Sequence, residues 1–348
     1  MQYRGYTYYN NRLTLGHSGR LVALGLPCLA FANVRNVCHL RAPRAKKDTK
    51  KDKIMATNVL RIAIFGKEFQ AERQASIHTV LDSLTSHGAE IYIERTFFQY
   101  LTTVLAINVP VQGVFDNYNF DVDVVISIGG DGTFLHAASM VGAKGTPILG
   151  VNTGRLGFLA DVLPSEFDAA MAELMTGQYA IEEHAVIQVE ADGEPIEGSP
   201  YALNDIAVLK RDNAAMISVR TSVNGDFLVT YQADGLIIST PTGSTAYGLS
   251  NGGPIIVPTA RNLCLTPVAP HSLNIRPIVI NDDSEIQLEV ESRSHNFLVA
   301  IDGRSEKLLE STRLTIRKAP YYIKIIKRRG QRYFSTLREK MMWGADQR

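Results

Sequence analysis

The pattern of hydrophobic and polar positions divides the chain into two halves of different rhythm. From Val59 on, short runs of apolar, often β-branched residues alternate with segments whose apolar residues recur at helical spacing. The predicted strands are residues 59–65, 89–94, 122–128 and 147–151, and the predicted helices are residues 68–86, 134–141 and 164–175. The Val/Ile run at 122–128 is typical of a central parallel strand covered on both faces. This alternation predicts a parallel α/β sheet.

The second half contains strands that follow one another without intervening helices. The predicted strands are residues 184–190, 202–209, 217–223, 227–232, 278–280, 285–290, 297–301 and 313–317. Asn224-Gly225 indicates a hairpin, because both positions of such a turn adopt positive φ. The pattern favours an antiparallel sandwich or barrel. We expect a last helix at 333–343 that folds back on the first domain.

The length of 348 residues suggests two domains. We place an α/β domain at residues 58–180, joined by the C-terminal helix at about 331–345, and a β domain at 181–330. Residues 1–54 are expected to be a disordered or dispensable leader. They hold 11 Lys/Arg and 2 Asp/Glu out of totals of 36 and 35, so the remaining 294 residues carry a net charge of −8.

Three interpretations of the leader stay open. It could be a secretory signal with a cleavage site at Ala30-Phe31-Ala32, or an Arg-rich organelle transit peptide. The third is that the true start is Met55, and that the upstream segment reflects a wrongly chosen start codon or is a dispensable extension. We favour the third, because a strand pattern follows Met55 almost at once.

Composition excludes several classes of protein. The acidic body argues against a general nucleic-acid binder and against a membrane-binding face. Three cysteines are too few for a disulfide scaffold or a cysteine-built zinc site. The chain has no run of eighteen apolar residues, so we expect no ordinary membrane span and a cytoplasmic location.

A glycine-rich turn, Gly129-Gly-Asp-Gly-Thr133, connects the central strand to the helix after it. Ligands bind at this place in open α/β sheets, and free amides at a helix start favour an anion. The turn is neither a dinucleotide fingerprint nor a Walker loop, and it has no lysine. Asp131 within it would repel a phosphate unless it accepts a proton or holds a metal. The alternative is that Asp131 only caps the helix.

The segment from Asp234 to Ser250 carries the second concentration of polar residues. A predicted strand runs into Ser, Thr and Gly residues around Pro241, which provide many small donors with little bulk. Such a segment can surround a polar ligand such as a ribose or a pyrophosphate.

The two motifs together resemble the NAD kinase family, whose members carry a GGDGT turn and a DGLIISTPTGSTAY-like segment about a hundred residues later. Further matches are Asn152–Leu159, Leu203–Val208, His271–Pro277 and Ile301–Arg304. The glycine turn alone is weak support, since phosphofructokinases and lipid kinases look similar there, whereas the second motif is highly specific. The resemblance covers the chain from about Leu60 to its carboxyl end.

The resemblance implies a Rossmann-like parallel α/β domain followed by an all-β sandwich domain that carries most NAD contacts. It also implies transfer of the γ-phosphoryl of ATP to the 2′-hydroxyl of the adenosine ribose of NAD, which gives NADP. By similarity Asp131 would be the proton acceptor. The implied ligand-binding residues are Gly132, His136, Phe158, Asn204, Asp205, Asp234, Thr245, Ala246, Tyr247, Gly248, Leu249, Ser250 and Asp302.

Within this set the resemblance gives individual roles. Phe158 would pack against adenine, Asn204 and Asp205 would hold ribose hydroxyls, and Asp302 would lie at the site edge and reach a neighbouring subunit's ligand. The chain has Asp205 where the family has Glu, so its carboxylate must reach further. His136 and Gln232 stand where Arg is frequent. Phe158 and Tyr247 have the alternative interpretation of ordinary packing residues.

The resemblance further implies Mg²⁺ or another divalent cation carried in with ATP rather than a dedicated protein site, and a homodimer or homotetramer. The alternative function is a small-molecule or lipid kinase that shares only the glycine turn. A third is a non-catalytic dinucleotide sensor, against which the presence of Asp131 argues.

Overall fold

The structure is a computed structural model that describes residues 59–68, 73–154, 157–193, 195–211, 215–330 and 333–342. The predicted leader, with its three interpretations, lies outside the described residues. All described residues belong to one compact unit. No helix among them is long and apolar enough to cross a membrane.

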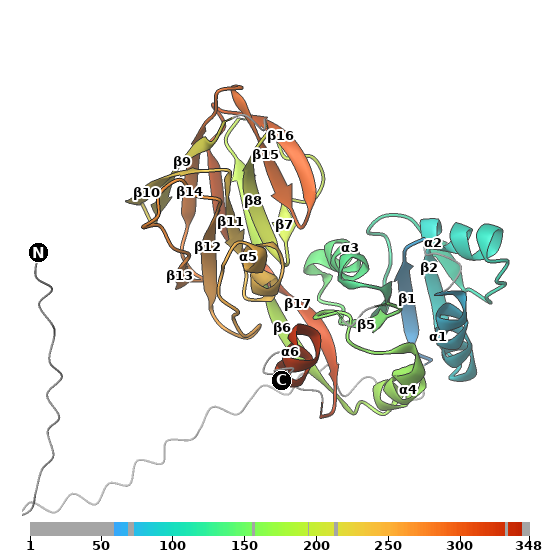
Figure 1. Cartoon of the computed structure of the whole chain (residues 1–348). Coiled ribbons are helices and arrows are strands. Elements are labelled where there is room, and N and C mark those ends of the chain that lie inside the picture. Colours follow the sequence, from blue (N-terminus) through green and yellow to red (C-terminus); the bar gives the residue numbers. More distant parts are fainter. Residues whose placement is uncertain are drawn as a thin grey trace, which may run out of the picture. The chain divides into compact units, whose positions relative to one another are not determined.

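Five parallel strands build the first part of the molecule (Figure 1). They are β1 (Arg61–Gly66), β2 (Glu90–Glu94), β3 (Gly113–Phe115), β4 (Val124–Gly129) and β5 (Ile148–Asn152). Their order in the sheet is β3-β2-β1-β4-β5, and every neighbouring pair is parallel. The prediction of a parallel α/β sheet is confirmed. The strand order reverses between β1 and β4, which is where open α/β sheets bind ligands.

Helices cover both faces of this sheet, as the alternate residues of β1 show. Ile62 and Ile64 pack with α1 (Gln74–Ser86) and α4 (Phe167–Met175), while Ala63 and Phe65 pack with α3 (Asp131–Val141). All six residues of β4 are buried. Burial on both faces is the physical reason for its apolar run, which Ser127 interrupts. A short helix, α2 (Arg95–Gln99), and a π-helical turn, η3 (Tyr100–Val104), follow β2.

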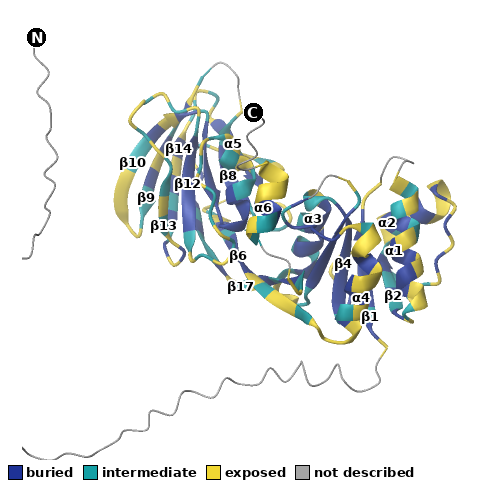
Figure 2. Cartoon of the chain, turned by 60° about the horizontal axis from the view of Figure 1, so that its bottom comes forward, coloured by how far each residue is buried: buried dark blue, intermediate teal, exposed yellow. Residues whose placement is uncertain are grey.

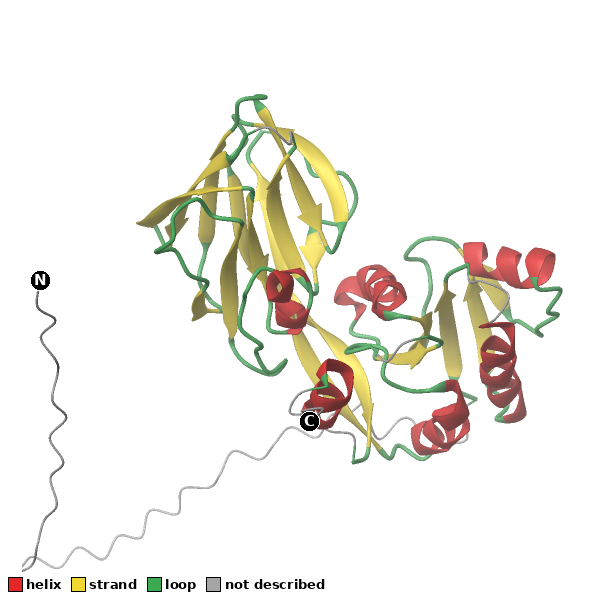
Figure 3. Ribbon diagram, viewed as in Figure 1, coloured by secondary structure: helices red, strands yellow, loops and turns green. Residues whose placement is uncertain are grey.

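The second part is an antiparallel sandwich (Figure 3). One sheet has the order β13-β12-β11-β8-β15-β16, and the other contains β10-β9-β14-β17, with β6 paired to β17 and β7 paired to β6. The strands are β6 (Tyr179–Ala191), β7 (Tyr201–Ala202), β8 (Asp205–Lys210), β9 (Ile217–Val223), β10 (Asp226–Ala233), β11 (Gly235–Ser239), β12 (Asn262–Val268), β13 (Ile278–Asn281), β14 (Ile286–Glu291), β15 (Asn296–Ile301), β16 (Arg304–Leu309) and β17 (Leu314–Arg328). Their inward residues form one buried apolar cluster between the sheets (Figure 2).

Turn chemistry sets several of these strand ends. The predicted hairpin is confirmed, since Asn224 and Gly225 have φ of 52° and 83° between β9 and β10.

β12 and β16 were not expected from the sequence. β12 contains Pro267, which argues against a strand, and β16 is a polar edge strand.

Two long strands join the parallel and antiparallel parts. β17 pairs with β14 through Leu314–Ile316 and, further along, places Ile325 beside Ile148 of β5. β6 runs antiparallel to β17 over most of its length, with a register shift between Lys318 and Tyr322. The two halves of the sequence therefore share one continuous sheet. The chain ends in α6 (Tyr333–Met341).

Candidate functional site

The glycine turn lies at the carboxyl end of β4, beside the reversal of strand order. Gly130 is the N-cap of α3 and Asp131 is its first residue, and no side chain caps this helix. The capping alternative for Asp131 is therefore wrong. Its carboxylate instead accepts hydrogen bonds from three consecutive backbone amides. Oδ2 accepts from Phe158 at 2.9 Å, and Oδ1 accepts from Leu159 at 3.1 Å and Ala160 at 3.0 Å.

Close packing holds this carboxylate in place while leaving it reachable. A Cβ on Gly157 would collide with Oδ1 of Asp131 and would lie 2.8 Å from the carbonyl oxygen of Ala160. Only glycine fits there, because the backbone approaches the carboxylate so closely. The Asp131 side chain nevertheless keeps 29% of its surface exposed. It is both oriented and accessible.

Helix α6 brings two groups against this region. The Nζ of Lys340 lies 3.4 Å from Oδ2 of Asp131 and 4.2 Å from the centre of the Phe158 ring. The Tyr333 ring lies 6.5 Å from the Phe158 ring. The expected helix at the carboxyl end thus contacts the GGDGT region, although no sequence pattern singled out Lys340.

His136 projects from α3 one turn beyond the glycine turn. Its Nε2 lies 2.7 Å from Oε1 of Glu94, and its ring meets the Phe65 ring edge-on. The side chain keeps 47% of its surface exposed. His136 therefore has a carboxylate partner of its own.

A second carboxylate is held by backbone amides at the start of β8. Asp302, at φ 47°, accepts from the amides of Leu203 and Asn204, each at 2.8 Å, and from that of Asp205 at 3.1 Å. Gly243 packs against Asn204, whose Cα would lie 2.7 Å from a Cβ at that glycine. Asp302 thereby fixes the turn that presents Asn204 and Asp205. Its carboxylate points into its own chain.

The Asp205 carboxylate is almost wholly buried. Burial, with a smaller contribution from the negative charge of Asp302, raises its pKa to about 7, while a hydrogen bond from the Tyr247 amide works in the opposite direction. Burial likewise raises the pKa of Asp302, against the effect of its three amide bonds. Asp205 therefore changes its charge near neutral pH.

The second motif follows β11 as a 3-10 turn, η6 (Thr242–Thr245), and a short helix, α5 (Tyr247–Ser250). Within the motif Tyr247 and Ser250 are exposed, Thr245, Ala246 and Leu249 are half-buried, and Gly248 is buried. Tyr247 keeps 40% of its surface exposed, so it is not a core packing residue.

A buried histidine supports this segment from behind. Nδ1 of His184 on β6 lies 2.8 Å from the Thr242 hydroxyl, and Nε2 lies 3.4 Å from Glu182. Burial lowers the pKa of His184, which favours the neutral ring. Sequence reasoning missed this residue, because a lone histidine in a strand carries no signal of its partners.

Contacts of α6 connect the two regions. The Tyr333 hydroxyl reaches the carbonyl of Ile256 at 3.5 Å, and the amide of Ile256 donates to the Ser244 hydroxyl at 3.0 Å. Figures 1 and 2 both show α3, α5 and α6 close to one another. Through α6 the structure thus links the Asp131 turn to the second motif.

Asp234 is the exception. It precedes β11, and the six residue steps from Asp234 to Thr240 span about 20 Å of extended chain. Its carboxylate pairs with Lys210 at 2.7 Å, at the end of β8 opposite to Asp205. Asp234 is therefore not brought together with Asp131 or Asp205 in this chain.

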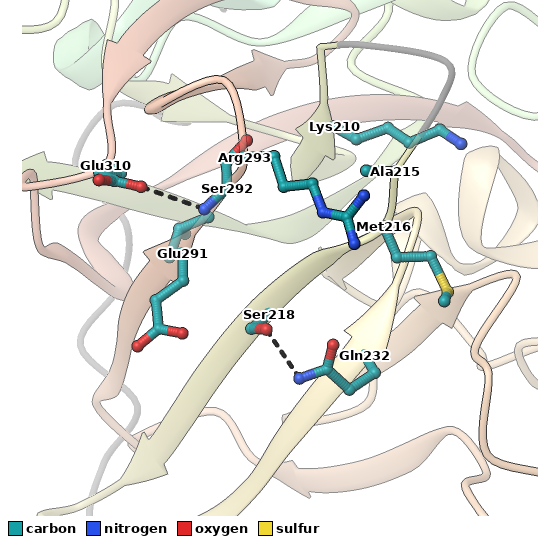
Figure 4. A pocket seen from close by; sticks show the side chains of 10 residues that line it. Lys210, Ala215, Met216, Ser218, Gln232, Glu291, Ser292, Arg293 and Glu310 are labelled. Carbon is teal, nitrogen blue, oxygen red and sulfur yellow. Dashed lines mark hydrogen bonds between the residues drawn. The ribbon is translucent and has the colours of Figure 1, made fainter.

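A cavity of about 920 Å³ opens at that far end (Figure 4). Lys210, Gln232 and Arg293 are among its lining residues, and the Gln232 amide bonds the Ser218 hydroxyl at 2.7 Å. Gln232, which stands where the family often has Arg, lines it, but none of the predicted ligand-binding residues does. The volume of a hollow says nothing of its chemistry, so we centre the candidate site on Asp131. No group of three His, Cys, Asp or Glu side chains in the described part of the chain is arranged to hold a metal ion.

Comparisons with known proteins cover both halves of the chain. The family model of the ATP-NAD kinase N-terminal domain matches residues 68–179, and that of the C-terminal domain matches residues 203–328. An NAD kinase from Bacteroides fragilis is 60% identical over 289 residues, which cover 83% of this chain and 100% of the relative. One from Porphyromonas gingivalis is 46% identical over 286 residues, covering 82% and 98%.

Solved structures give the same result for the fold. A yeast NADH kinase complexed with NADH superposes with a TM-score of 0.74 at 21% identity, over 84% of this chain and 90% of that one. An NAD kinase from Archaeoglobus fulgidus in complex with ATP has a TM-score of 0.64 at 26% identity, over 81% and 99%. The chain therefore belongs to the NAD kinase family.

Proposed function

We propose that this chain transfers the γ-phosphoryl of ATP to the 2′-hydroxyl of the adenosine ribose of NAD, with Asp131 as the proton acceptor. The observation that carries the assignment is the Asp131 carboxylate, which three amides hold at the carboxyl end of β4 and which stays partly exposed. A small-molecule or lipid kinase sharing only the glycine turn is disfavoured, because relatives match both domains.

In the proposed reaction the ribose hydroxyl oxygen attacks the γ-phosphorus. The new O–P bond forms as the bond to the β-phosphate oxygen breaks, and ADP leaves with that electron pair. Asp131 accepts the hydroxyl proton. The three amides keep its carboxylate in one orientation, so little reorganisation is needed at the moment of transfer.

The glycines of the turn support a phosphate beside Asp131. Neither Gly130 nor Gly132 has positive φ, and a Cβ on either would meet no described atom within 4 Å. Nothing in the described chain therefore requires glycine at these positions. Close approach of a ligand gives the reason, with the first amides of α3 pointing at an anion.

The remaining residues of the motifs would hold the dinucleotide. We assign adenine stacking to Phe158 and ribose hydroxyls to Asn204 and Asp205. Thr245, Ala246, Tyr247, Gly248, Leu249 and Ser250 would line the NAD site, and Asp302 would act by positioning residues 203–205. His136 would contact a phosphate. Asp234, at the far end of β11, would serve the nicotinamide half.

The donor set fits a divalent cation that arrives on the ATP phosphates. Asp131 is the carboxylate within the turn, and its oxygens already accept three amides. Mg²⁺ commonly binds through one or two carboxylates and the substrate phosphates. Such an ion would supply charge neutralisation of the phosphates. A homodimer or homotetramer and a cytoplasmic location belong to the same proposal, as does the expectation that neither nucleic acid nor a membrane is a partner.

The test is NADP formation by the purified full-length chain supplied with ATP, Mg²⁺ and NAD, with NADH in parallel. We expect product from NAD. Asp131→Asn should lower kcat by about 10³-fold, the usual size of general-base catalysis, while NAD binding changes by less than about threefold. Wild-type protein that binds NAD but forms no product would refute the reaction. A variant of near-full rate would refute only the role of Asp131.

A further inference from the structure

The glycine turn has no cationic side chain of its own, although a carboxylate stands in it. Asp131 carries negative charge at the place where an incoming triphosphate would put more. In the described part of the chain, the ion pair of Asp131 is with Lys340. This lysine lies 209 positions away in the sequence and is delivered by α6.

One face of α6 is directed at the candidate site. Thr336 and Leu337 are buried, and Tyr333 and Lys340 flank them on the same face at helical spacing. Tyr333 contacts the Phe158 ring and Lys340 lies over it. Arg338 is exposed on another face, where its guanidinium donates to the Ser335 hydroxyl of the same helix at 3.4 Å. The helix therefore directs one cation toward Asp131 and another away from it.

The position of Lys340 is better suited to binding the γ-phosphate of ATP than to a permanent ion pair with Asp131. Reacting atoms sit roughly 3–3.5 Å apart in a productive complex, so the γ-phosphorus would lie about 6 Å from the Asp131 carboxylate. Nζ of Lys340 is already 3.4 Å from that carboxylate, on a flexible four-carbon stem. Rotations near the end of its side chain bring it to the phosphoryl oxygens while α6 stays docked.

We propose that Lys340 is a catalytic residue that contacts the γ-phosphoryl group during transfer and supplies the positive charge that the glycine turn lacks. The inference rests on the proposed reaction. Lys340 stays protonated throughout, since the hydroxyl proton goes to Asp131 and the leaving electron pair to ADP. Before substrate binds, the ammonium group offsets the charge of Asp131 and occupies the face of Phe158. Charge placed where it develops in the transition state acts mainly on kcat.

The experiment compares three variants of the full-length chain. Lys340→Met removes the charge and keeps the length of the side chain, Lys340→Arg keeps the charge, and Arg338→Met is the matched control on the exposed face of the same helix. Initial rates of NADP formation are measured against ATP and against NAD, and thermal unfolding is followed for each variant.

We expect Lys340→Met to lower kcat about 100-fold, with the KM for NAD within threefold and Tm close to wild type. Lys340→Arg should recover to within about tenfold of wild type, and Arg338→Met should stay within twofold. If Lys340→Met unfolds, Lys340→Ala assayed with and without added ethylammonium gives the answer, since a catalytic cation is restored in part by the free amine.

Three results would overturn the inference. One is a Lys340→Met rate equal to that of Arg338→Met. Another is a loss confined to Tm and to the KM of both substrates, unrescued by Arg or by the amine, which would make Lys340 a residue that docks the helix. The last is a rate above wild type, which would make the lysine a block. Failure of the proposed function is distinguishable, because then wild type itself forms no NADP.

Discussion

Two aspartates of this chain are held by the same local device and placed in different surroundings. Asp131 accepts from the amides of residues 158–160, and Asp302 accepts from the amides of residues 203–205. Each therefore anchors a neighbouring turn by three consecutive donors. Asp131 remains 29% exposed beside a lysine, whereas burial of the Asp302 carboxylate raises its pKa.

The comparison shows that backbone amides orient a carboxylate without deciding its use. Asp131 lies at the start of α3, beside the point where the strand order of the parallel sheet reverses, and part of its carboxylate is exposed. A ligand could therefore contact it. Asp302 is buried against the turn at residues 203–205, so under the proposed function it would act on a ligand only through Asn204 and Asp205. Solvent exposure and neighbouring residues, rather than residue type, thus distinguish the aspartate proposed for catalysis from the aspartate that anchors a turn.

The largest effect is expected from a substitution that disturbs only the three amide hydrogen bonds to Asp131. In Gly157→Ala the new Cβ would collide with Oδ1 of Asp131, and the nearby backbone leaves it little room. We expect kcat to fall about 100-fold, because a small misplacement of a positioned group has an effect of this size. Steady-state kinetics check this. An unchanged kcat would mean that the orientation of the carboxylate does not matter.

The matched substitution at the second set of amide hydrogen bonds is Asp302→Asn. Its amide group cannot accept from all three backbone donors, so the turn at 203–205 loses at least one charge-assisted bond. We expect the KM for NAD to rise about tenfold with kcat within threefold, since such bonds are worth roughly 1.5–3 kcal/mol. The same rate assay reports both constants. A fall in kcat with unchanged KM would contradict the positioning role.

The smallest expected effect concerns the pH dependence of stability. Asp205 has a folded pKa of about 7, above its ordinary value of 3.8, so the folded state binds this proton more tightly than the unfolded state. Its contribution to stability is complete below about pH 4 and is lost as the pH rises to 7. Asp205→Asn removes that loss, so Tm should rise by on the order of 3 °C at pH 8 and scarcely at pH 4.

Thermal scans of both proteins at pH 4, 6 and 8 measure this difference. A constant offset between them would mean that Asp205 titrates well away from neutral pH. The KM for NAD in the same variant separates a ribose contact from a purely structural carboxylate.

Patterns of the sequence carried much of the fold. Period-two and period-3.6 apolar spacing located most strands and helices, and the hairpin at Asn224-Gly225 followed from turn chemistry. The short β3, the proline-containing β12 and the polar edge strand β16 escaped, because their apolar signal is weak or interrupted. The separation of Asp234 from Thr240 also follows from the sequence pattern, because an extended strand connects the two residues.

By itself the sequence determined the glycine turn, the Ser/Thr/Gly segment and the family they indicate, because these depend on local spacing and backbone freedom. Only the tertiary structure decided which amides hold Asp131, that Asp302 anchors residues 203–205, and that Lys340 reaches Asp131 from 209 positions away. Such pairings form where elements distant in the sequence pack against one another. The spacing of apolar residues shows which face of an element is buried, but not which other element it packs against.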